Sequence, residues 1–329
     1  MRAAWITLLV VVAALAVWPM VANDYLIVLT LRALMYSLVV LSFSLLAGQL
    51  GLVSLLQTTF AGIAGYAVAI LGVTYGWTFP WTVLAAFGLA LISALVFALI
   101  SLRASGIGFM MLTLALGQMV WALSFQWVDL TKGMDGIAGV RPPVILGLDL
   151  GDSHALYAVT APIVVLTFAA VAVLIHSRFG LLMRGIQDNV VRMRALGYPV
   201  LKCRLTAFLL ASLIAAAGGI LLAWDTRVMT PMGLDLSRAV WVLTAAVVGG
   251  YRYLIGVPIG VTVMVILEAV LNQYTDRHLM VFGIVLAGSI LLLPNGIAAL
   301  IDDARSKLRQ GERVMRPEQS GQDQGGANV

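Results

Sequence analysis

The chain is dominated by apolar runs that are each long enough to cross a lipid bilayer. Of its 329 residues, 61% are hydrophobic and only 11% are charged, and the mean hydropathy is +1.02. Soluble domains carry about 25% charged residues, so this composition excludes a large water-soluble core. A helix crosses the hydrocarbon layer with about 20 apolar residues. The sequence therefore predicts an all-α, polytopic membrane protein.

Ten segments qualify as candidate spans, so we expect about ten (nine to ten) transmembrane helices. The eighth is short and ends at Gly249-Gly250, which leaves open a partial or re-entrant span. The first follows Arg2 and is long, so we expect a retained helix rather than a cleaved signal peptide. The ten candidates are about 4–22, 26–47, 56–74, 79–101, 106–128, 155–175, 204–224, 237–250, 254–271 and 279–296.

The basic residues between these spans predict the orientation in the membrane. With a cytoplasmic N-terminus, fourteen of the twenty Lys and Arg residues fall on the inner side and six on the outer side. The positive-inside rule favours this arrangement over its reverse. We therefore expect a multi-pass protein of the plasma (inner) membrane with both termini cytoplasmic. Residues 1–300 would form the transmembrane domain, and the polar tail 301–329 would be largely disordered.

The segment from Arg178 to Arg204 holds six basic residues between two apolar stretches, so it cannot lie in hydrocarbon. Its part from Gly185 to Leu196 has helix-forming composition, with Gly197 placed as a C-terminal cap and Pro199 just beyond. Apolar and charged residues alternate along it. We expect a short cytoplasmic helix that docks in a groove of a partner protein or lies on anionic lipid headgroups.

Motifs for catalysis are missing from the sequence. A Walker A loop needs Gly-Lys-Ser/Thr, but the three lysines follow Thr131, Leu201 and Ser306. A single cysteine, Cys203, and three separated histidines do not suggest a metal site. The net charge of +5 is spread over loops and does not indicate nucleic-acid binding. We expect no enzyme and no cofactor in this chain, so that ATP and Mg would be bound by separate subunits.

Ionisable residues inside the predicted spans are few. Glu268 lies about one turn from the outer end of the ninth span, where it is either structural at the interface or part of a translocation path. Arg32 lies near an outer end and is expected to extend to the interface. This scarcity makes a stand-alone secondary transporter or channel the alternative hypothesis. Small residues such as those at 61–65, 215–219 and 256–260 predict close helix packing.

Residues 177–224 (SRFGLLMRGIQDNVVRMRALGYPVLKCRLTAFLLASLIAAAGGILLAW) resemble the cytoplasmic coupling loop and following span of permease subunits of branched-chain amino-acid ABC importers. Three further regions resemble the same family in order and spacing: 48–71, 101–140, and 246–271 with 291–300. The sequence departs from the family pattern at Gln57, where His is frequent, at Val190, where an acid is common, at Tyr251-Arg252 and at Pro294-Asn295.

The resemblance implies a permease subunit of an ATP-driven importer for branched-chain amino acids or a related small polar solute. It also implies partners: a second permease subunit, expected as a heterodimer, two ATPase subunits and a soluble substrate-binding protein. Alternating access would be driven through a coupling helix at residues 184–197, within the cytoplasmic loop 176–204. The outer loop 129–153 would face the binding protein.

Three groups of site residues follow from the same resemblance. The residues expected to couple to the ATPase are Arg184, Gln187, Asp188, Asn189, Arg192, Arg194, Ala195, Leu196 and Gly197. Those expected along the translocation path are Gly51, Ser54, Gln57 and Thr113, with Glu268 as a polar contributor. Those expected to face the binding protein are Thr131, Gly133, Asp135 and Gly136.

Overall fold

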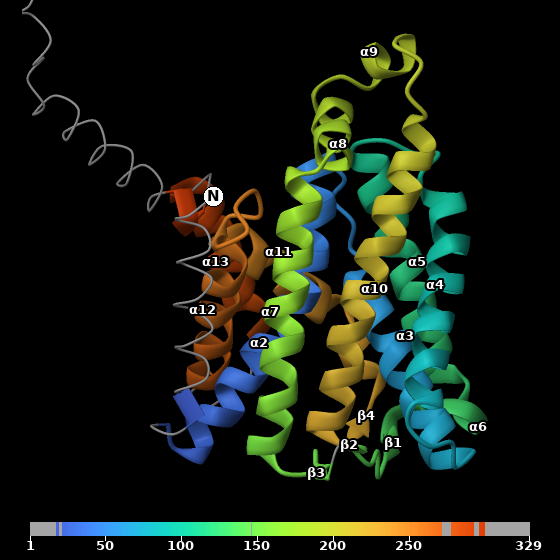
Figure 1. Cartoon of the computed structure of the whole chain (residues 1–329), viewed down its shortest axis with the longest axis vertical. Helices are drawn as coiled ribbons and strands as arrows, with labels where there is room; N and C mark the ends of the chain where they lie inside the picture. Colours follow the sequence, from blue (N-terminus) through green and yellow to red (C-terminus); the bar gives the residue numbers. More distant parts are fainter. Residues whose placement is uncertain (1–17, 20–21, 146, 272–277, 293–295, 300–329) are drawn as a thin grey trace, which may run out of the picture.

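A computed structural model describes residues 18–19, 22–145, 147–271, 278–292 and 296–299. Within these ranges the chain forms a helical bundle in which six helices are long and apolar enough to cross a membrane (Figure 1). These are α2 (Asp24–Leu50), α3 (Gln57–Ala69) continued by the π-helical turn η1 (Ile70–Thr74), α4 (Trp81–Ser101), α5 (Ile107–Gln126), α7 (Ser153–His176) and α10 (Val200–Thr226).

Three further apolar helices are shorter than a typical span. They are α11 (Leu236–Gly249), α12 (Gly256–Leu271) and α13 (His278–Leu292). At 1.5 Å per residue, the 14 residues of α11 extend only about 21 Å, less than the roughly 30 Å of a hydrocarbon core. The predicted count of about ten spans is therefore not confirmed. The first predicted span, 4–22, and the predicted disordered tail lie almost entirely outside the described residues.

The two ends of the bundle carry different structures (Figure 1). One end carries α8 (Arg178–Asp188) and α9 (Val190–Ala195), and we call it the α8/α9 end. The other, the strand end, carries α6 (Val128–Thr131), the 3-10 turns η2 (Gly133–Asp135) and η3 (Pro231–Leu234), and the two-residue strands β1 (Ile137–Ala138), β2 (Val144–Ile145), β3 (Leu148–Asp149) and β4 (Val228–Met229). The predicted loops 176–204 and 129–153 thus lie at opposite ends of the bundle.

Short antiparallel ladders join distant parts of the strand end. β1 pairs with β4, so that Ile137 lies opposite Met229, while β2 and β3 form a local hairpin. Gly136 makes the first pairing possible, because its φ is +68° and a Cβ there would lie 2.5 Å from the carbonyl oxygen of Met229. The segment after α5 is thereby tied to the segment after α10.

The core is centred on α2, α3 and α10, and small residues let these helices approach closely. A Cβ at Gly219 of α10 would lie 2.0 Å from the carbonyl oxygen of Ala61 in α3. A Cβ at Gly260 of α12 would lie equally close to the carbonyl oxygen of Ala245 in α11. Lipid supplies no hydrophobic drive for helix association, so close backbone contacts of this kind contribute much of the attraction. The predicted packing role of these small residues is confirmed.

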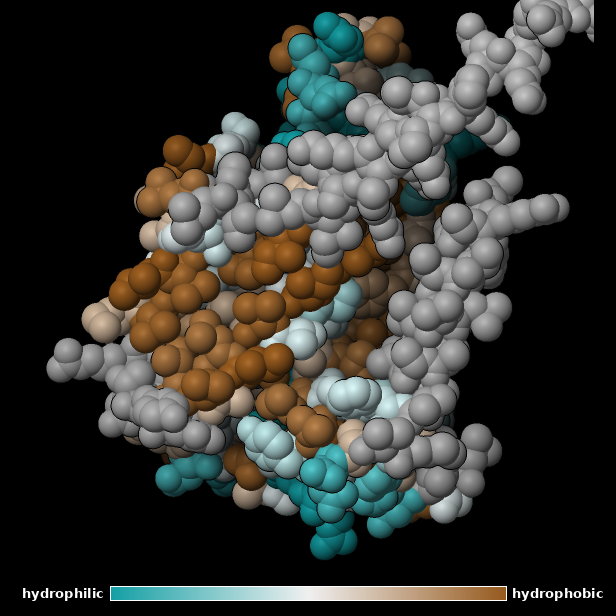
Figure 2. Space-filling model, turned by 90° about the vertical axis from the view of Figure 1, so that its left-hand side faces the viewer, coloured by the Kyte–Doolittle hydropathy of each residue, from teal (hydrophilic) through white to brown (hydrophobic). Residues whose placement is uncertain are grey.

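The outward-facing surface is apolar between the two ends. Figure 2 shows one such face, where hydrophobic side chains form a broad area and hydrophilic residues gather above and below it. Large side chains on other helices are also exposed, among them Ile92 of α4 at 62% and Leu166 of α7 at 68%. A surface of this kind suits lipid or an apolar partner chain rather than water.

Candidate functional site

The basic segment between α7 and α10 forms two helices instead of the single predicted helix from Gly185 to Leu196. The break lies at Asn189, whose backbone is extended and whose side-chain Oδ1 accepts a hydrogen bond from the N–H of Arg192 at 2.9 Å. Asn is among the preferred N-cap residues, so it starts α9 and ends α8. The prediction of one continuous helix is wrong. The C-terminal cap is confirmed, because Gly197 has φ +82° and Pro199 follows it.

Helix α9 presents a mixed surface at the tip of the α8/α9 end. The side chains of Val190 and Met193 pack toward the core, and Met193 lies against Gly185. The opposite side exposes Val191 at 76% and Leu196 at 66%. Of the predicted coupling residues, Gln187 is half-buried, and the others are exposed: Arg184, Asp188, Asn189, Arg192, Arg194, Ala195, Leu196 and Gly197. Apolar side chains flanked by cations form a surface of the type that protein partners bind.

Two predicted coupling residues instead hold the element to the bundle. Arg184 donates from Nη2 to the carbonyl oxygen of Ile175 at 2.7 Å and therefore caps the end of α7. Gln187 is half-buried beside Gly51, where a Cβ would lie 3.3 Å from its Cγ. The coupling segment thus contacts the start of the non-helical stretch that joins α2 to α3.

That stretch, residues 51–56, runs from the α8/α9 end into the bundle. It begins at Gly51, where φ is +66°, and it leads to Gln57, the first residue of α3, which is only 1% exposed. Two hydroxyls replace the missing helical acceptors: Thr113 of α5 accepts from the N–H of Leu55 at 3.3 Å, and Ser54 accepts from the N–H of Leu56 at 3.4 Å. Helix α3 therefore begins in the interior.

Helix α11 also begins in the interior, opposite the start of α3. Its far end lies at the α8/α9 end, because Tyr251, two residues after α11, contacts Gly48 near the end of α2. The two helix starts enclose a space too narrow for a water molecule, which we call the central constriction. Its lining residues are Phe43, Ser54, Leu55, Gln57, Thr58, Ala239 and Val242.

Polar side chains at the central constriction lack partners. Among the residues that the structure describes, neither amide atom of Gln57 nor the hydroxyl of Thr58 has a hydrogen-bond partner, and all three atoms are buried. The same holds for the indole N–H of Trp241, in the first turns of α11 near the constriction. Leaving such a group unpaired inside the bundle costs about 1–3 kcal/mol. The path residues Ser54, Gln57 and Thr113 are thus brought together, whereas Gly51 lies nearer the α8/α9 end. Thr58 and Trp241 were not predicted.

Glu268, expected either as a structural residue near the interface or as part of a translocation path, forms an ion pair between two helices. It lies one turn from the end of α12, but that helix is short, and Arg238 of α11 approaches its Oε1 to 2.9 Å. The guanidinium also lies 5.8 Å from the ring centroid of Tyr36, halfway along α2. Spacing within one helix gives no signal for this pair.

A second ion pair joins α2 to α10. Arg32, expected to extend alone to the interface, lies 3.4 Å from the carboxylate of Asp225. The carboxylate is 9% exposed, so the pair fixes the two helices near the strand end. Within the described ranges, no three His, Cys, Asp or Glu side chains gather as a metal site would require.

Three of the four residues predicted to face a binding protein are buried. Thr131 donates to the carbonyl oxygen of Ser124 at 2.7 Å and closes the turn after α5, while Gly133 and Gly136 shape the backbone of η2 and β1. Only Asp135 is exposed. The buried three hold the loop in place, so that of these four residues only Asp135 is accessible to a partner.

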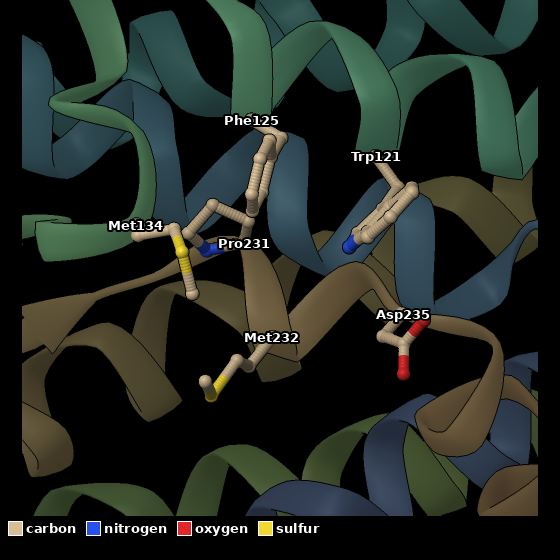
Figure 3. A pocket seen from close by; sticks show the side chains of 6 residues that line it. All are labelled: Trp121, Phe125, Met134, Pro231, Met232 and Asp235. Carbon is tan, nitrogen blue, oxygen red and sulfur yellow. The ribbon is translucent and has the colours of Figure 1, made fainter. Parts of the chain in front are cut away.

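An open pocket lies between α5 and the start of α11, in the half of the bundle toward the strand end (Figure 3). Its volume is about 190 Å³. We call it the aspartate pocket, and its lining residues are Trp121, Phe125, Met134, Pro231, Met232 and Asp235. The rings of Trp121 and Phe125 form one wall, with centroids 5.8 Å apart. None of these residues was singled out from the sequence.

Proteins of similar sequence are named as transport permeases. The family described as branched-chain amino acid transport system / permease component matches residues 25–293. The chain is 23% identical to the high-affinity branched-chain amino acid transport system permease protein LivM of Salmonella typhimurium, over 90% of this chain and 75% of that protein. It is also 23% identical to LivM of Escherichia coli, over 88% and 74% of the two chains.

A more distant relative is the probable branched-chain amino acid transport permease protein LivH of Methanocaldococcus jannaschii. It is 25% identical over 46% of this chain and 50% of its own length. No solved structure matches the chain. The family match covers most of the sequence and includes the constriction, the aspartate pocket and the α8/α9 end. The chain therefore belongs to the family of permease components of branched-chain amino acid transport systems.

Proposed function

We propose that the chain is a permease subunit of an ATP-driven importer for branched-chain amino acids and forms part of the translocation path. The relatives are named as permeases of high-affinity systems for these substrates. A second permease chain would complete the path, two ATPase subunits would bind at the α8/α9 end in the cytoplasm, and a soluble binding protein would deliver substrate at the strand end. ATP and Mg would be bound by the ATPase subunits.

The central constriction is the observation that carries this proposal. Interrupted helices are tolerated inside a membrane only where other protein or a water-filled cavity satisfies the backbone, and in transporters they mark the substrate path. Here two helices start facing each other, and the unpaired atoms of Gln57 and Thr58 lie between them. In this state the constriction closes the path. Separation of α3 from α11 would open it and hydrate these atoms.

The contact between Gln187 and Gly51 supplies a route from the ATPase to the constriction. Movement of α8 and α9 would act on residue 51 and hence on the stretch that leads to Gln57. Because Arg192 and Arg194 are exposed and make no ion pair among the described residues, they are available to an acidic surface of an ATPase.

Charge reversal at α9 tests the coupling. We expect Arg192→Glu combined with Arg194→Glu to abolish ATP-dependent leucine uptake in proteoliposomes containing the complete importer. Arg103→Glu is a matched control, because Arg103 is an exposed cation near the end of α4, outside the α8–α9 segment. Unchanged uptake by the double variant would refute the docking assignment. Loss of uptake in both variants would point to insertion rather than coupling.

The ion pair between Arg238 and Glu268 is the observation that favours the alternative of a stand-alone secondary transporter. Ionisable groups inside a bundle are a feature of proton-coupled transport. This alternative predicts leucine uptake by the purified chain alone, driven by a proton gradient and without ATP. The importer hypothesis predicts no uptake under those conditions and ATP-dependent uptake after the partner subunits are added.

A further inference from the structure

The aspartate pocket leads toward the central constriction. Asp235 is the N-cap residue of α11, and Ala239, one turn further along the same helix, lines the constriction. Pro231 and Met232 belong to η3, which joins β4 to α11, and Trp121 comes from the last turns of α5. A solute that enters from the strand end would therefore meet this pocket before the closed part of the path.

The lining is apolar apart from one carboxylate and the indole N–H. Two aromatic rings, two thioethers and a proline offer a surface suited to an aliphatic side chain. The volume of about 190 Å³ lies below the roughly 300–1,000 Å³ typical of sites for larger organic ligands, so the pocket suits a small solute.

The carboxylate of Asp235 has unused acceptor capacity. Its Oδ2 atom accepts a hydrogen bond from the hydroxyl of Ser237. Its Oδ1 atom has no partner among the residues that the structure describes, and the nearby guanidinium of Arg238 pairs with Glu268 instead. Figure 3 shows the carboxylate beside the indole of Trp121 at the edge of the pocket. A carboxylate with a free acceptor atom beside an apolar wall can accept a charge-assisted hydrogen bond from a cationic donor.

We propose that the aspartate pocket is an entry site for the transported amino acid, in which Asp235 accepts a hydrogen bond from the α-ammonium group and the aliphatic side chain packs against Trp121, Phe125 and Met232. This inference rests on the proposed function and names the residues that would hold the substrate. It assigns to the permease a recognition of the free amino group, which an apolar path alone would not provide.

Protection of an introduced thiol tests the site in the assembled importer. Met232→Cys places a thiol at a pocket residue that is 67% exposed, and the natural Cys203 is buried and 3% exposed. Val144→Cys is a matched control, because Val144 is 64% exposed at the strand end but outside the pocket. We expect leucine to slow the reaction of a small maleimide with the first thiol and not with the second.

Two changes identify the ammonium contact. N-acetyl-leucine, which lacks the ammonium group, should not protect the thiol at position 232. Asp235→Asn in the same background should raise the half-protecting leucine concentration about tenfold or more, since hydrogen bonds to charged groups contribute about 1.5–3 kcal/mol. Asn is also a favoured N-cap, so this variant retains the start of α11. If it assembles poorly, the comparison of leucine with N-acetyl-leucine still decides.

Three results would overturn the proposal: equal protection by N-acetyl-leucine, no protection by leucine, or a thiol at 232 that is unreactive in the complex even without substrate. The last result would mean that a second subunit fills the pocket. In each case ATP-dependent leucine uptake by the unaltered importer shows whether the entry-site proposal alone fails or the proposed importer function fails with it. If that uptake is present, only the entry site is refuted, and if it is absent, the proposed function fails as well.

Discussion

The hydroxyl oxygen of Thr113 in α5 accepts a hydrogen bond at 3.3 Å from the backbone N–H of Leu55, in the stretch that joins α2 to α3. Thr113 is fully buried, and its own hydroxyl proton is donated to the carbonyl oxygen of Met110 at 2.9 Å. One side chain thus satisfies a non-helical N–H inside an apolar bundle. The position of the central constriction depends on this contact from a neighbouring helix.

Thr113→Val keeps the shape of the side chain and removes the acceptor. The N–H of Leu55 would then be buried without a partner, at a cost of about 1–3 kcal/mol. We expect a lower thermal stability of the purified complex and altered leucine uptake. Thr113→Ser keeps the hydroxyl and is expected to behave nearly as the unaltered protein. A larger effect of Thr113→Ser than of Thr113→Val would assign the role of Thr113 to its methyl group instead.

Gln57→Met tests whether the unpaired amide serves the opening of the path. Both amide atoms are buried and have no partner in the part of the chain that the structure describes, so a side chain of similar length without them should stabilise the closed state by about 1–3 kcal/mol. We expect a higher thermal stability together with slower uptake, because the open state loses a group that water can solvate. Gln118→Met, at a half-buried position of α5, is the control and should change neither.

A combination of higher stability with unchanged uptake at position 57 would remove Gln57 from the path. Lower stability would show that the amide has partners in the assembled importer, for example from the second permease chain. Thermal stability and leucine uptake must therefore both be measured on the same preparations.

The long helices could be predicted because their signal is local. Each of the six candidate spans matches a predicted apolar run within a few residues, and hydropathy over about 20 residues suffices to find such runs. The start of α3 is close to its predicted position at residue 56. That it begins inside the bundle could not be predicted, since burial of Gln57 depends on α5 and α11, which come from distant parts of the sequence.

The other differences between the sequence predictions and the structure have two causes. One is competition between local sequence preferences, and the other is contact between residues far apart in the sequence. The helix-forming residues around Asn189 predicted one helix, but the side chain of Asn189 caps a new helix start. Glu268 and Arg238 are 30 positions apart, so only packing of α11 against α12 brings them together. Asp235 could not be predicted as a site residue, because a single acid before a short apolar run has the same sequence pattern as an ordinary loop residue.

Gly219→Ala should disrupt the contact between α3 and α10. The added Cβ would lie 2.0 Å from the carbonyl oxygen of Ala61, and backbone atoms cannot move aside without shifting a whole helix. Overpacking of a core costs about 1–3 kcal/mol or more, so we expect reduced thermal stability and less assembled complex. Gly88→Ala is the control: nothing lies within 4 Å of its Cβ, and Ala favours helix by about 1 kcal/mol. A destabilising Gly88→Ala would contradict this account.

The ion pair between Arg238 and Glu268 can be separated into its charge and its packing by a double-mutant cycle. Glu268→Met leaves the guanidinium of Arg238 without its counter-ion. Removing one partner of a buried pair costs about 3–5 kcal/mol, and the lower end is expected here because the two side chains are 33% and 24% exposed. Arg238→Met should cost a similar amount, while the double variant Arg238→Met with Glu268→Met should be nearly neutral.

Thermal unfolding of the purified importer measures the stability terms, and leucine uptake measures the function. Near-neutral stability of the double variant together with normal uptake would assign the pair to helix packing alone. Loss of uptake in a stable double variant would instead place the pair on the moving part of the path, because α11 carries both Arg238 and the constriction residues Ala239 and Val242. Contacting residues are expected to show a coupling energy. A double variant whose loss of stability equals the sum of the two single losses would therefore refute the interaction itself.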